Sequence, residues 1–294
     1  MATNPKTDVL ERLREGVTNL TNSDQWMQWL DIQRRFHAYS WGNCLLIALQ
    51  RPDATRIAGY RRWQEMGRHV LKGEKGIAIL APIIYRNKVD SEDAETEGIG
   101  HGIVTAFRPA YVFDVSQTDG EPLPEVTHRL TGSDPDGAFQ SLTAVANSFG
   151  FDVELSDSLG RKNGDFQFEL NRIRINESVD AAQAVKSLAH EIGHGILHGP
   201  EVRPADATRG LLELEAESVA YVVCSELGLD SSQYSFGYVA GWAGGGEAAS
   251  KLISSSAQRI NLAARKILTE FGIDTALDRN GTASTPVSHE PVLA

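Results

Sequence analysis

Apolar positions near the start of the chain recur at the spacing of an amphipathic helix. The pattern predicts one helix over residues 5–20, a second from Ser23 or Asp24 to Phe36, and a third over Cys44–Leu49. A fourth, short helix is predicted over Ala58–Met66, because Gly67 suits the left-handed backbone that closes a helix.

The pattern then changes from helical spacing to strands. Ile77–Tyr85 and Ile103–Val115 are rich in β-branched and aromatic residues, which predicts two strands. The connection between them contains the acidic run Asp90–Glu97, which has no residue that would form a core. We therefore expect a hairpin with a solvated tip.

Helical spacing dominates again after residues 117–136, which are rich in Gly, Pro, Asp and Thr. The predicted elements of this part, in chain order, are a helix over 138–149, strands over 153–155 and 166–175, and helices over about 180–199, 211–227 and 247–271. The sequence thus predicts an α+β fold of two domains. Their expected bounds are 1–125, a helical and β-hairpin domain, and 126–275, with a disordered tail over 276–294.

Composition places the chain among ordinary globular proteins, with 41% hydrophobic and 23% charged residues in 294. No apolar run approaches 18 residues, and the polar stretch Met1–Thr7 lacks the apolar segment of a signal peptide. Cys44 and Cys224 each lie in an apolar segment, which favours buried free thiols over a disulfide. We expect a cytoplasmic protein that does not insert into membranes.

The charge is unevenly distributed along the chain. The formal net charge of −11 argues by itself against a nucleic-acid partner. Residues 31–75, however, contain nine Lys or Arg and only four Asp or Glu, a net charge of +5. The acidic excess therefore belongs to the later part of the chain, and a nucleic-acid partner stays open for the earlier part.

The sequence His190-Glu191-x-x-His194 lies within the predicted helix over about 180–199. Residues four apart share one helical face, so both imidazoles can reach one metal ion. Glu191 is then placed to act as general base toward a metal-activated water. The alternative is a surface helix with two unrelated histidines.

A catalytic zinc site needs a third protein ligand, and the following helix offers three carboxylates, on Glu213, Glu215 and Glu217. Glu213 and Glu217 are one turn apart and can point the same way, whereas Glu215 is about 200° round the helix from Glu213. We assign Glu213 as the ligand and Glu217 as the residue that orients a ligand histidine through its other ring nitrogen. All three could instead be solvent-facing charges.

Some neighbouring residues admit more than one role. The strand that contains Asp165 could be the sheet edge along which an extended peptide pairs, or an ordinary strand within the sheet. His198 shares the face of His194, and a capping or ligand-orienting role suits it better than ligation. Tyr221, Tyr234 and Tyr238 are candidates for stabilising an oxyanion, although each could equally belong to the core.

Basic and aromatic residues interleave between residues 34 and 75, and single-stranded nucleic acid requires such a mixture of cations and stacking faces. No helix-turn-helix or zinc-finger pattern accompanies them, which points away from duplex reading. The alternative is an ordinary helical domain with a basic face and a tryptophan core. The candidate DNA-binding residues are Arg34, Arg35, Tyr39, Trp41, Asn43, Tyr60, Arg61, Arg62, Trp63, Lys72 and Lys75.

The order of several short motifs resembles the ArdC-type antirestriction proteins. The first half contains Tyr39-x-Trp41-x-Asn43, Gly59-Tyr60-x-x-Trp63, Gly67-x-x-Val70-x-Lys72-Gly73-Glu74-Lys75-Gly76 and Val112-Phe113-Asp114-x-x-Gln117-Thr118. The second half contains His190-Glu191-x-x-His194, Glu213-x-x-x-Glu217 and Tyr238-x-x-Gly241-Trp242, and is similar to the zincin-like metallopeptidase domain of the same proteins and to the ImmA/IrrE peptidases.

This resemblance implies a protein that binds single-stranded DNA and protects incoming DNA from restriction. It also implies one Zn²⁺ per chain, held by His190, His194 and Glu213, and a protein or peptide substrate. Two hypotheses follow. The chain is either a DNA-bound zinc metallopeptidase or a DNA-binding protection factor whose metal centre is structural.

Overall fold

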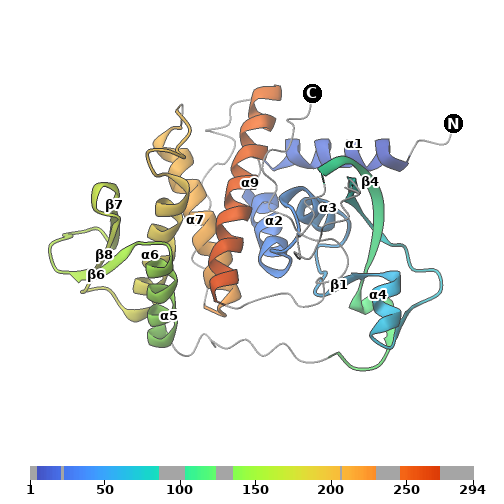
Figure 1. Cartoon of the computed structure of the whole chain (residues 1–294), viewed down its shortest axis with the longest axis horizontal. Helices are drawn as coiled ribbons and strands as arrows, with labels where there is room; N and C mark the ends of the chain where they lie inside the picture. The colour runs from blue at the N-terminus through green and yellow to red at the C-terminus, as the bar shows by residue number, and fades with distance from the viewer. Residues whose placement is uncertain are drawn as a thin grey trace, which may run out of the picture.

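The computed structural model describes residues 5–20, 23–85, 103–123, 135–205, 207–229 and 246–271. Its first half opens with three helices, α1 (Pro5–Asn19), α2 (Ser23–Arg35) and α3 (Trp41–Gln50), which confirm the helical periodicity (Figure 1). Helix α3 begins earlier than predicted because Ser40 caps it, its hydroxyl accepting a hydrogen bond from the backbone N–H of Asn43.

A three-stranded antiparallel sheet follows these helices. Strands β3 (Ile77–Tyr85) and β4 (Ile103–Asp114) form the predicted hairpin, and the sheet order is β1-β4-β3. The prediction of one helix over Ala58–Met66 was wrong at its start. Residues Ile57–Gly59 form β1, which pairs with the end of β4, and helix α4 spans only Tyr60–Glu65. The acidic run Asp90–Glu97 lies outside the described residues.

Asp114 and Gln117 tie together the loops at one end of this sheet. The Asp114 carboxylate accepts hydrogen bonds from the backbone N–H groups of Thr55 and Arg56, at 2.8 and 3.1 Å. The side-chain amide of Gln117 donates to Glu74 and to the Lys75 carbonyl, at 2.8 and 2.9 Å. Gln117 thereby fixes the basic loop that carries Lys72 and Lys75, and Asp114 fixes the loop before β1. Beside them, β2 (Arg68–Val70) pairs with β5 (Thr118–Gly120), both too short for periodicity to reveal.

Two side-chain amides of α3 cover the open edge of strand β3. Asn43 bonds both backbone groups of Leu80 at 2.9 Å, its Nδ2 donating to the carbonyl and its Oδ1 accepting from the N–H. Gln50 does the same for Ala78, at 2.9 and 3.0 Å. Unpaired edge groups attract other strands, so these amides both satisfy the backbone and protect the edge.

Replacing Asn43 with leucine is expected to destabilise the protein by about 1–3 kcal/mol for each Leu80 backbone group left unpaired. Urea denaturation measures this loss, and Asn147→Ala on the exposed face of helix α5 (Pro135–Ser148) is the control, with an expected change within about 0.5 kcal/mol. Lost DNA affinity at unchanged stability would contradict the structural role.

The second half contains a small mixed sheet. Strands β6 (Asp152–Ser156), β7 (Gly164–Gln167) and β8 (Arg172–Asn176) lie in the order β6-β8-β7, with β6 parallel and β7 antiparallel to β8. The prediction of one strand over 166–175 was wrong. The 3₁₀ turn Phe168–Leu170 and Asn171, whose φ of 48° is left-handed, reverse the chain there and make β7 the edge of the sheet.

Helices α5, α6 (Ala181–Leu197), α7 (Arg209–Glu226) and α9 (Gly246–Glu270) confirm the four remaining helical predictions. Figure 1 shows α7 and α9 between α6 on one side and α1–α3 on the other. One continuous core of buried apolar residues extends through both halves and contains the free thiols of Cys44 and Cys224.

Buried polar contacts also cross between the two predicted domains. The Trp26 indole N–H donates to the Ser218 hydroxyl of α7 at 3.0 Å, and the Asn261 amide of α9 donates to Gln33 at 2.7 Å. The expected boundary near residue 125 therefore separates two parts that pack against each other. The predicted tail over 276–294 lies outside the described residues, and none of the helices in the described ranges is long and apolar enough to cross a membrane.

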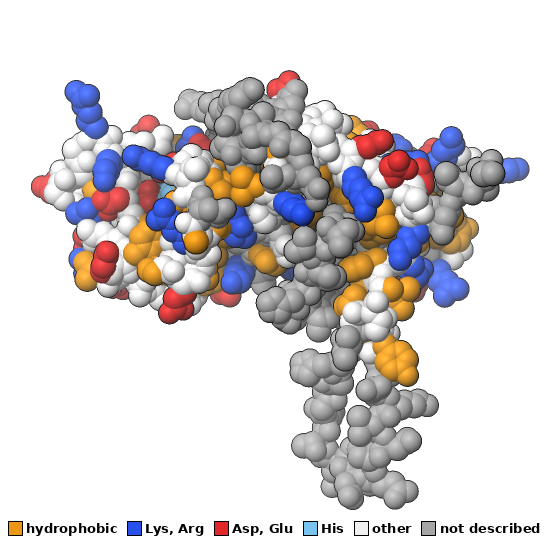
Figure 2. Space-filling view, turned by 90° about the horizontal axis from the view of Figure 1, so that it is seen from above, with side chains coloured by type: hydrophobic (Ala, Val, Ile, Leu, Met, Phe, Trp, Pro, Cys, Tyr) orange, Lys and Arg blue, Asp and Glu red, His pale blue; other side chains and the backbone are white. Residues whose placement is uncertain are grey.

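Basic side chains are less segregated in space than along the sequence. Figure 2 shows Lys and Arg side chains at both ends of the face that it presents, among acidic ones. The exposed cations of the second half include Arg161, Arg203 and Lys266. They provide matched controls for the basic residues of the first half.

Candidate metal centre

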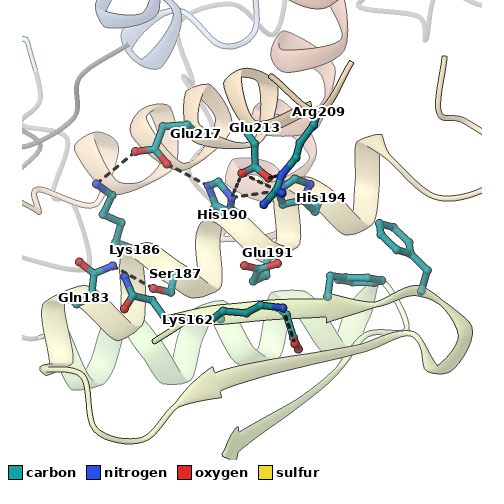
Figure 3. Close-up of a pocket in the computed structure, with 15 residues that line it drawn as sticks. Lys162, Gln183, Lys186, Ser187, His190, Glu191, His194, Arg209, Glu213 and Glu217 are labelled. Atoms are coloured by element: carbon teal, nitrogen blue, oxygen red, sulfur yellow. Dashed lines mark hydrogen bonds and ion pairs between the residues drawn. The ribbon is translucent and has the colours of Figure 1, made fainter. Parts of the chain in front are cut away.

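Helix α6 presents the two histidines of the H-E-x-x-H motif side by side. Asp180 caps this helix, its carboxylate accepting from the Gln183 backbone N–H at 2.8 Å. His190 and His194 lie one turn apart, and their Nε2 atoms are 3.0 Å from each other (Figure 3). The predicted helical spacing thus brings both ring nitrogens to one point.

Helix α7 adds a carboxylate to the same point. Oε2 of Glu213 lies 3.4 Å from His190 Nε2 and 3.6 Å from His194 Nε2. Gly193 allows the close approach of the two helices, since a Cβ there would lie 3.3 Å from the Ala216 Cα. The three candidate ligands offer atoms within 4.8 Å of one another.

Glu217 lies where the sequence places a residue that orients a ligand. Its Oε2 is 3.0 Å from His190 Nδ1, and Lys186 holds its other oxygen at 3.3 Å. A carboxylate accepts hydrogen bonds, so His190 Nδ1 carries a hydrogen, and in the neutral, ligating form of the ring the Nε2 lone pair faces His194 and Glu213. Burial by itself would lower the pKa of His190, but the hydrogen bonds to Glu213 and Glu217 raise it to about 9.

The donor set fits a divalent cation. In a four-coordinate zinc site the ligand atoms lie about 3.3 Å apart, as Zn–N bonds of about 2.0–2.1 Å require. The distances of 3.0, 3.4 and 3.6 Å among the Nε2 and Oε2 atoms are close to that value. Two imidazoles and one carboxylate also match the ligand types of catalytic zinc, which keeps a further position open.

Glu215 points away from this cluster, as its angular position on α7 predicts. Its side chain is 0% exposed and forms an ion pair with Arg259 of α9. His198 Nε2 lies 3.1 Å from Glu215 Oε2, and His198 Nδ1 lies 2.9 Å from His194 Nδ1. His198 is also the residue at which α6 ends, so it both caps the helix and contacts a candidate ligand. Arg259 could not be identified from sequence, because it lies 44 positions beyond Glu215.

Glu191 lies between the histidines and strand β7. Figure 3 shows its carboxylate turned from α6 toward β7, below His190 and His194. The side chain is 8% exposed, and burial raises its pKa above the ordinary value. A Cβ at Gly164 would lie 3.2 Å from the Glu191 Cγ, so the glycine lets β7 pass close to this carboxylate. A raised pKa suits a group that accepts and then donates a proton.

A cavity of about 550 Å³ opens in front of these residues. Apolar Phe166 and Phe168 line part of it, together with polar and charged side chains from the loop before β7, from α6 and from α7. The other lining residues are Lys162, Asn163, Gly164, Asp165, Gln183, Lys186, Ser187, His190, Glu191, His194, Arg209, Glu213 and Glu217. The cavity is large enough for a few residues of an extended peptide.

Within the described residues, none of the three tyrosines suggested for stabilising an oxyanion lies at the site. Tyr221 is buried in the core at 7% exposure. Tyr234 and Tyr238 lie outside the described residues, as do Gly241 and Trp242. Arg209, an exposed residue that was not singled out from sequence, lies 3.8 Å from Glu213 and lines the cavity.

Several of the candidate DNA-binding residues serve the core of the first half. Trp63 is 0% exposed, and its indole N–H donates to the Phe113 carbonyl at 2.9 Å. Trp41 and Asn43 are buried as well, and Tyr39 is half-buried against Phe36. These side chains pack within the domain, and the buried rings of Trp41 and Trp63 are not available for a base to stack on. The tryptophan-core alternative therefore explains this part of the pattern.

Arg34 and Arg35 are largely occupied by neighbouring groups. Arg34 bonds Asp31 at 2.7 Å and lies 3.9 Å from Glu226 of α7. Arg35 bonds Asp31 and the Ala54 carbonyl, and burial lowers its pKa. Both guanidinium groups thus contribute to the packing around α2.

The remaining candidates lie on the surface near two aromatic rings that the sequence prediction omitted. Tyr60 is 51% exposed and packs edge-on against Phe113 at 6.4 Å, and Tyr111 beside them is 53% exposed. Gly76 fits under both rings of β4, since a Cβ there would lie 2.9 Å from the Tyr111 Cβ and 3.1 Å from Phe113. We call Tyr60, Tyr111 and Phe113 the aromatic patch. The exposed cations on the same loops and helix are Arg61, Lys72 and Lys75, with half-buried Arg62 paired to Glu65 at 3.0 Å.

Two family models match the chain one after the other. The N-terminal domain of the anti-restriction factor ArdC matches residues 6–113, and the IrrE N-terminal-like domain, a peptidase family model, matches residues 146–224. The second match contains α6 and most of α7, and hence His190, Glu191, His194, Glu213 and Glu217. The predicted resemblance to both domains is confirmed.

Similar proteins support the same assignment of the fold. Two crystal structures of the antirestriction ArdC protein from plasmid R388, one metal-free and one with Mn(II), superpose with a TM-score of 0.56 at 24% and 22% identity, over 88% of this chain and 97% of theirs. An uncharacterised protein of Bacillus anthracis is 23% identical over 82% of this chain. The chain spans about half the length of that relative, 47%.

Proposed function

We propose that this ArdC-type chain binds single-stranded DNA through its first half and hydrolyses peptide bonds of a DNA-associated or restriction-related protein through its second half. The reaction would take place in the cytoplasm, at one Zn²⁺ held by His190, His194 and Glu213. The observation that carries the enzymatic part is the Glu191 carboxylate, which faces an open cavity directly beside the three candidate ligands.

The proposed mechanism assigns a separate task to each side chain. A metal ion held by the three ligands would polarise the attacking water and the peptide carbonyl. Glu191 accepts the proton that water loses as its oxygen attacks the carbonyl carbon, and then donates that proton to the leaving amine nitrogen. Burial raises the pKa of Glu191, which favours the protonated carboxyl that donates to the leaving amine. Glu217 keeps the His190 Nε2 lone pair directed at the ligand point.

Strand β7 offers a place for an extended peptide. It is the edge of the β6-β8-β7 sheet, and its residues Gly164, Asp165 and Phe166 line the cavity. A peptide that pairs with such an edge gains backbone hydrogen bonds without regard to its side chains. Gly164 brings this edge next to Glu191, so a peptide bond held there would lie beside the general base.

The DNA-binding part of the proposal rests on the aromatic patch and its neighbouring cations. Exposed Tyr60 and Tyr111 offer rings on which unpaired bases can stack, and Arg61, Lys72 and Lys75 are exposed for phosphate contacts. Hydrogen bonds from Gln117 fix the loop that carries the two lysines. Both parts of a single-strand site are thus presented on rigid elements.

Replacing Arg61, Lys72 and Lys75 together with alanine is expected to weaken single-stranded DNA binding strongly and to make its salt dependence shallower. Three lost phosphate contacts reduce the slope of log K against log salt by about 2 for a single strand. Tyr60→Ala removes a stacking ring instead, and should cost about 1–3 kcal/mol of binding with an unchanged salt slope. Fluorescence anisotropy with a labelled oligonucleotide over a salt series measures both effects.

The matched control for the triple variant removes three exposed cations from the second half, Arg161, Arg203 and Lys266. It changes the net charge equally and should leave the slope within experimental error of the unmodified protein. Equal losses in the two triple variants would mean that binding follows net charge alone, and would contradict a site at the aromatic patch. Equal binding of duplex and single strand would also contradict it.

The alternative function is a DNA-binding protection factor with a structural metal centre. The three candidate ligands lie on two packed helices, α6 and α7, which a metal ion held between them would join whether or not it is catalytic. Variants at Glu191, which lies beside the ligands without being one, separate the two functions.

A further inference from the structure

A hydrogen-bonded network begins at His194, and its other members do not line the cavity. It runs from His194 through His198 and Glu215 to Arg259, with separations of 2.9 Å between the two Nδ1 atoms and 3.1 Å between His198 Nε2 and Glu215 Oε2. His198 is 4% exposed and Glu215 is 0% exposed. The network joins helices α6, α7 and α9, and the proposed reaction makes no use of it.

The hydrogen positions in this hydrogen-bonded network follow from its charged end, at Glu215 and Arg259. The Glu215 carboxylate accepts hydrogen bonds from Arg259 and therefore also from His198, whose Nε2 must carry a hydrogen. A neutral His198 then has its lone pair on Nδ1, which accepts from Nδ1–H of His194. His194 is left with a lone pair on Nε2, the atom that faces His190 and Glu213.

Charge balance supports a neutral His198. Arg259 already compensates the Glu215 carboxylate, and its Nη2 also bonds the Ser256 hydroxyl at 3.3 Å. A second cation in this buried group would have no counter-charge and would cost free energy. The group of His198, Glu215 and Arg259 is therefore neutral as a whole.

We propose that His198 is a positioning residue which, held by Glu215 and Arg259, fixes the tautomer and ring orientation of His194 so that its Nε2 lone pair points at the metal. The inference rests on the proposed role of His194 as a ligand. Both ligand histidines then have the same tautomer, although different groups orient them. His190 is oriented by half-buried Glu217, which also pairs with Lys186, whereas His194 is oriented by an imidazole and a carboxylate that are both buried.

A purely structural role would not require this chemistry. Buried ion pairs contribute little to net stability compared with well-packed apolar residues of similar volume. Three helices could pack at this place with apolar side chains. A directional chain of donors and acceptors ending on a candidate ligand has a use only if the position of one hydrogen matters.

The direct test reads the hydrogen positions in the full, metal-free chain labelled with ¹⁵N. Long-range ¹H–¹⁵N correlation spectra distinguish protonated from unprotonated ring nitrogens. His194 should carry its hydrogen on Nδ1 and His198 on Nε2. A His194 that carries its hydrogen on Nε2 would overturn the inference, and this measurement needs no variant.

The second test measures zinc affinity by competition with a chromophoric chelator. His198→Phe removes the acceptor for His194 at similar volume and should weaken zinc binding about 10–100-fold, the range typical for groups that orient a metal ligand. His198→Asn places an oxygen near the position of the lost Nδ1 and should retain most of the affinity. If His198→Phe does not fold, the comparison of His198→Asn with Glu215→Gln replaces it, and the Gln variant is expected to bind zinc more weakly.

Ser218→Ala is the matched control, because it removes a buried hydrogen bond between α7 and Trp26 that does not belong to this network. It should lower stability while leaving zinc affinity unchanged. Equal zinc affinity in His198→Phe and Ser218→Ala would overturn the inference. Neither measurement uses a substrate, so an inactive protein with the expected tautomer and affinities would contradict the proposed peptidase function alone.

Discussion

Replacing Glu191 with alanine is expected to abolish peptide hydrolysis while the chain still binds one metal ion. Glu191 is the carboxylate turned toward the cavity and is not among the three converging ligands. A general base contributes about 10²–10⁴-fold to a rate, and the same group is also needed to protonate the leaving amine. The loss should therefore reach at least the upper part of this range, and Glu191→Gln, which keeps the size of the side chain, should be equally inactive.

The measurement combines metal analysis with cleavage of fluorescently labelled casein, followed over hours. Glu177→Ala, an exposed carboxylate between β8 and α6, is the control and should be fully active. Full activity of Glu191→Ala would rule out the proposed mechanism. In a transformation assay with unmodified plasmid DNA, protection that survives Glu191→Ala but fails in the Arg61, Lys72 and Lys75 variant would instead support the non-catalytic protection factor.

The candidate ligands could be predicted from sequence because each prediction used only local helical geometry. His190 and His194 share a face because they are four residues apart. The angle per residue alone places Glu213 and Glu215 on different faces of their helix. The structure brings His190, His194 and Glu213 together and turns Glu215 away. The same local rule predicted α6 and α7 with nearly correct ends.

The residues that sequence reasoning missed depend on contacts between distant segments. Arg259 reaches Glu215 from another helix, and Gln117 reaches Glu74 across 43 positions. Asn43 and Trp63 fitted a basic and aromatic pattern, but their roles are decided by the neighbouring Leu80 and Phe113 backbone. Composition cannot distinguish a tryptophan that stacks on a base from one that fills a core, because both are flanked by the same residues.

The domain prediction shows the same limit. A segment rich in Gly and Pro suggested a domain boundary near residue 125, and the two family models match residues 6–113 and 146–224, on either side of it. Its composition could not reveal that α2 packs against α7, with Trp26 bonded to Ser218. The helix that carries Glu213 therefore packs against the first half of the chain. The second half expressed alone would expose the apolar surface on which α2 lies.

Replacing His190 with alanine is expected to abolish metal binding at micromolar metal concentrations. The variant retains only His194 and Glu213 of the three converging groups, and the Glu217 carboxylate loses the imidazole that it orients. The affinity should fall by more than the 10–100-fold expected when only an orienting group is removed. Metal analysis after dialysis should give one ion per unmodified chain and less than about 0.1 per variant chain, by the same ligand argument.

The pH dependence of binding provides an independent check on the same residue. The hydrogen bonds to Glu213 and Glu217, acting against burial, raise the pKa of His190 to about 9 in the metal-free chain. Below that pH a metal ion must displace one proton from His190, so the apparent affinity should increase about tenfold per pH unit as pH rises from 6 to 8. His69→Ala, at an exposed histidine of β2, should leave both stoichiometry and slope unchanged. A flat pH profile would mean that the metal does not compete with this proton, and hence that His190 is not a ligand.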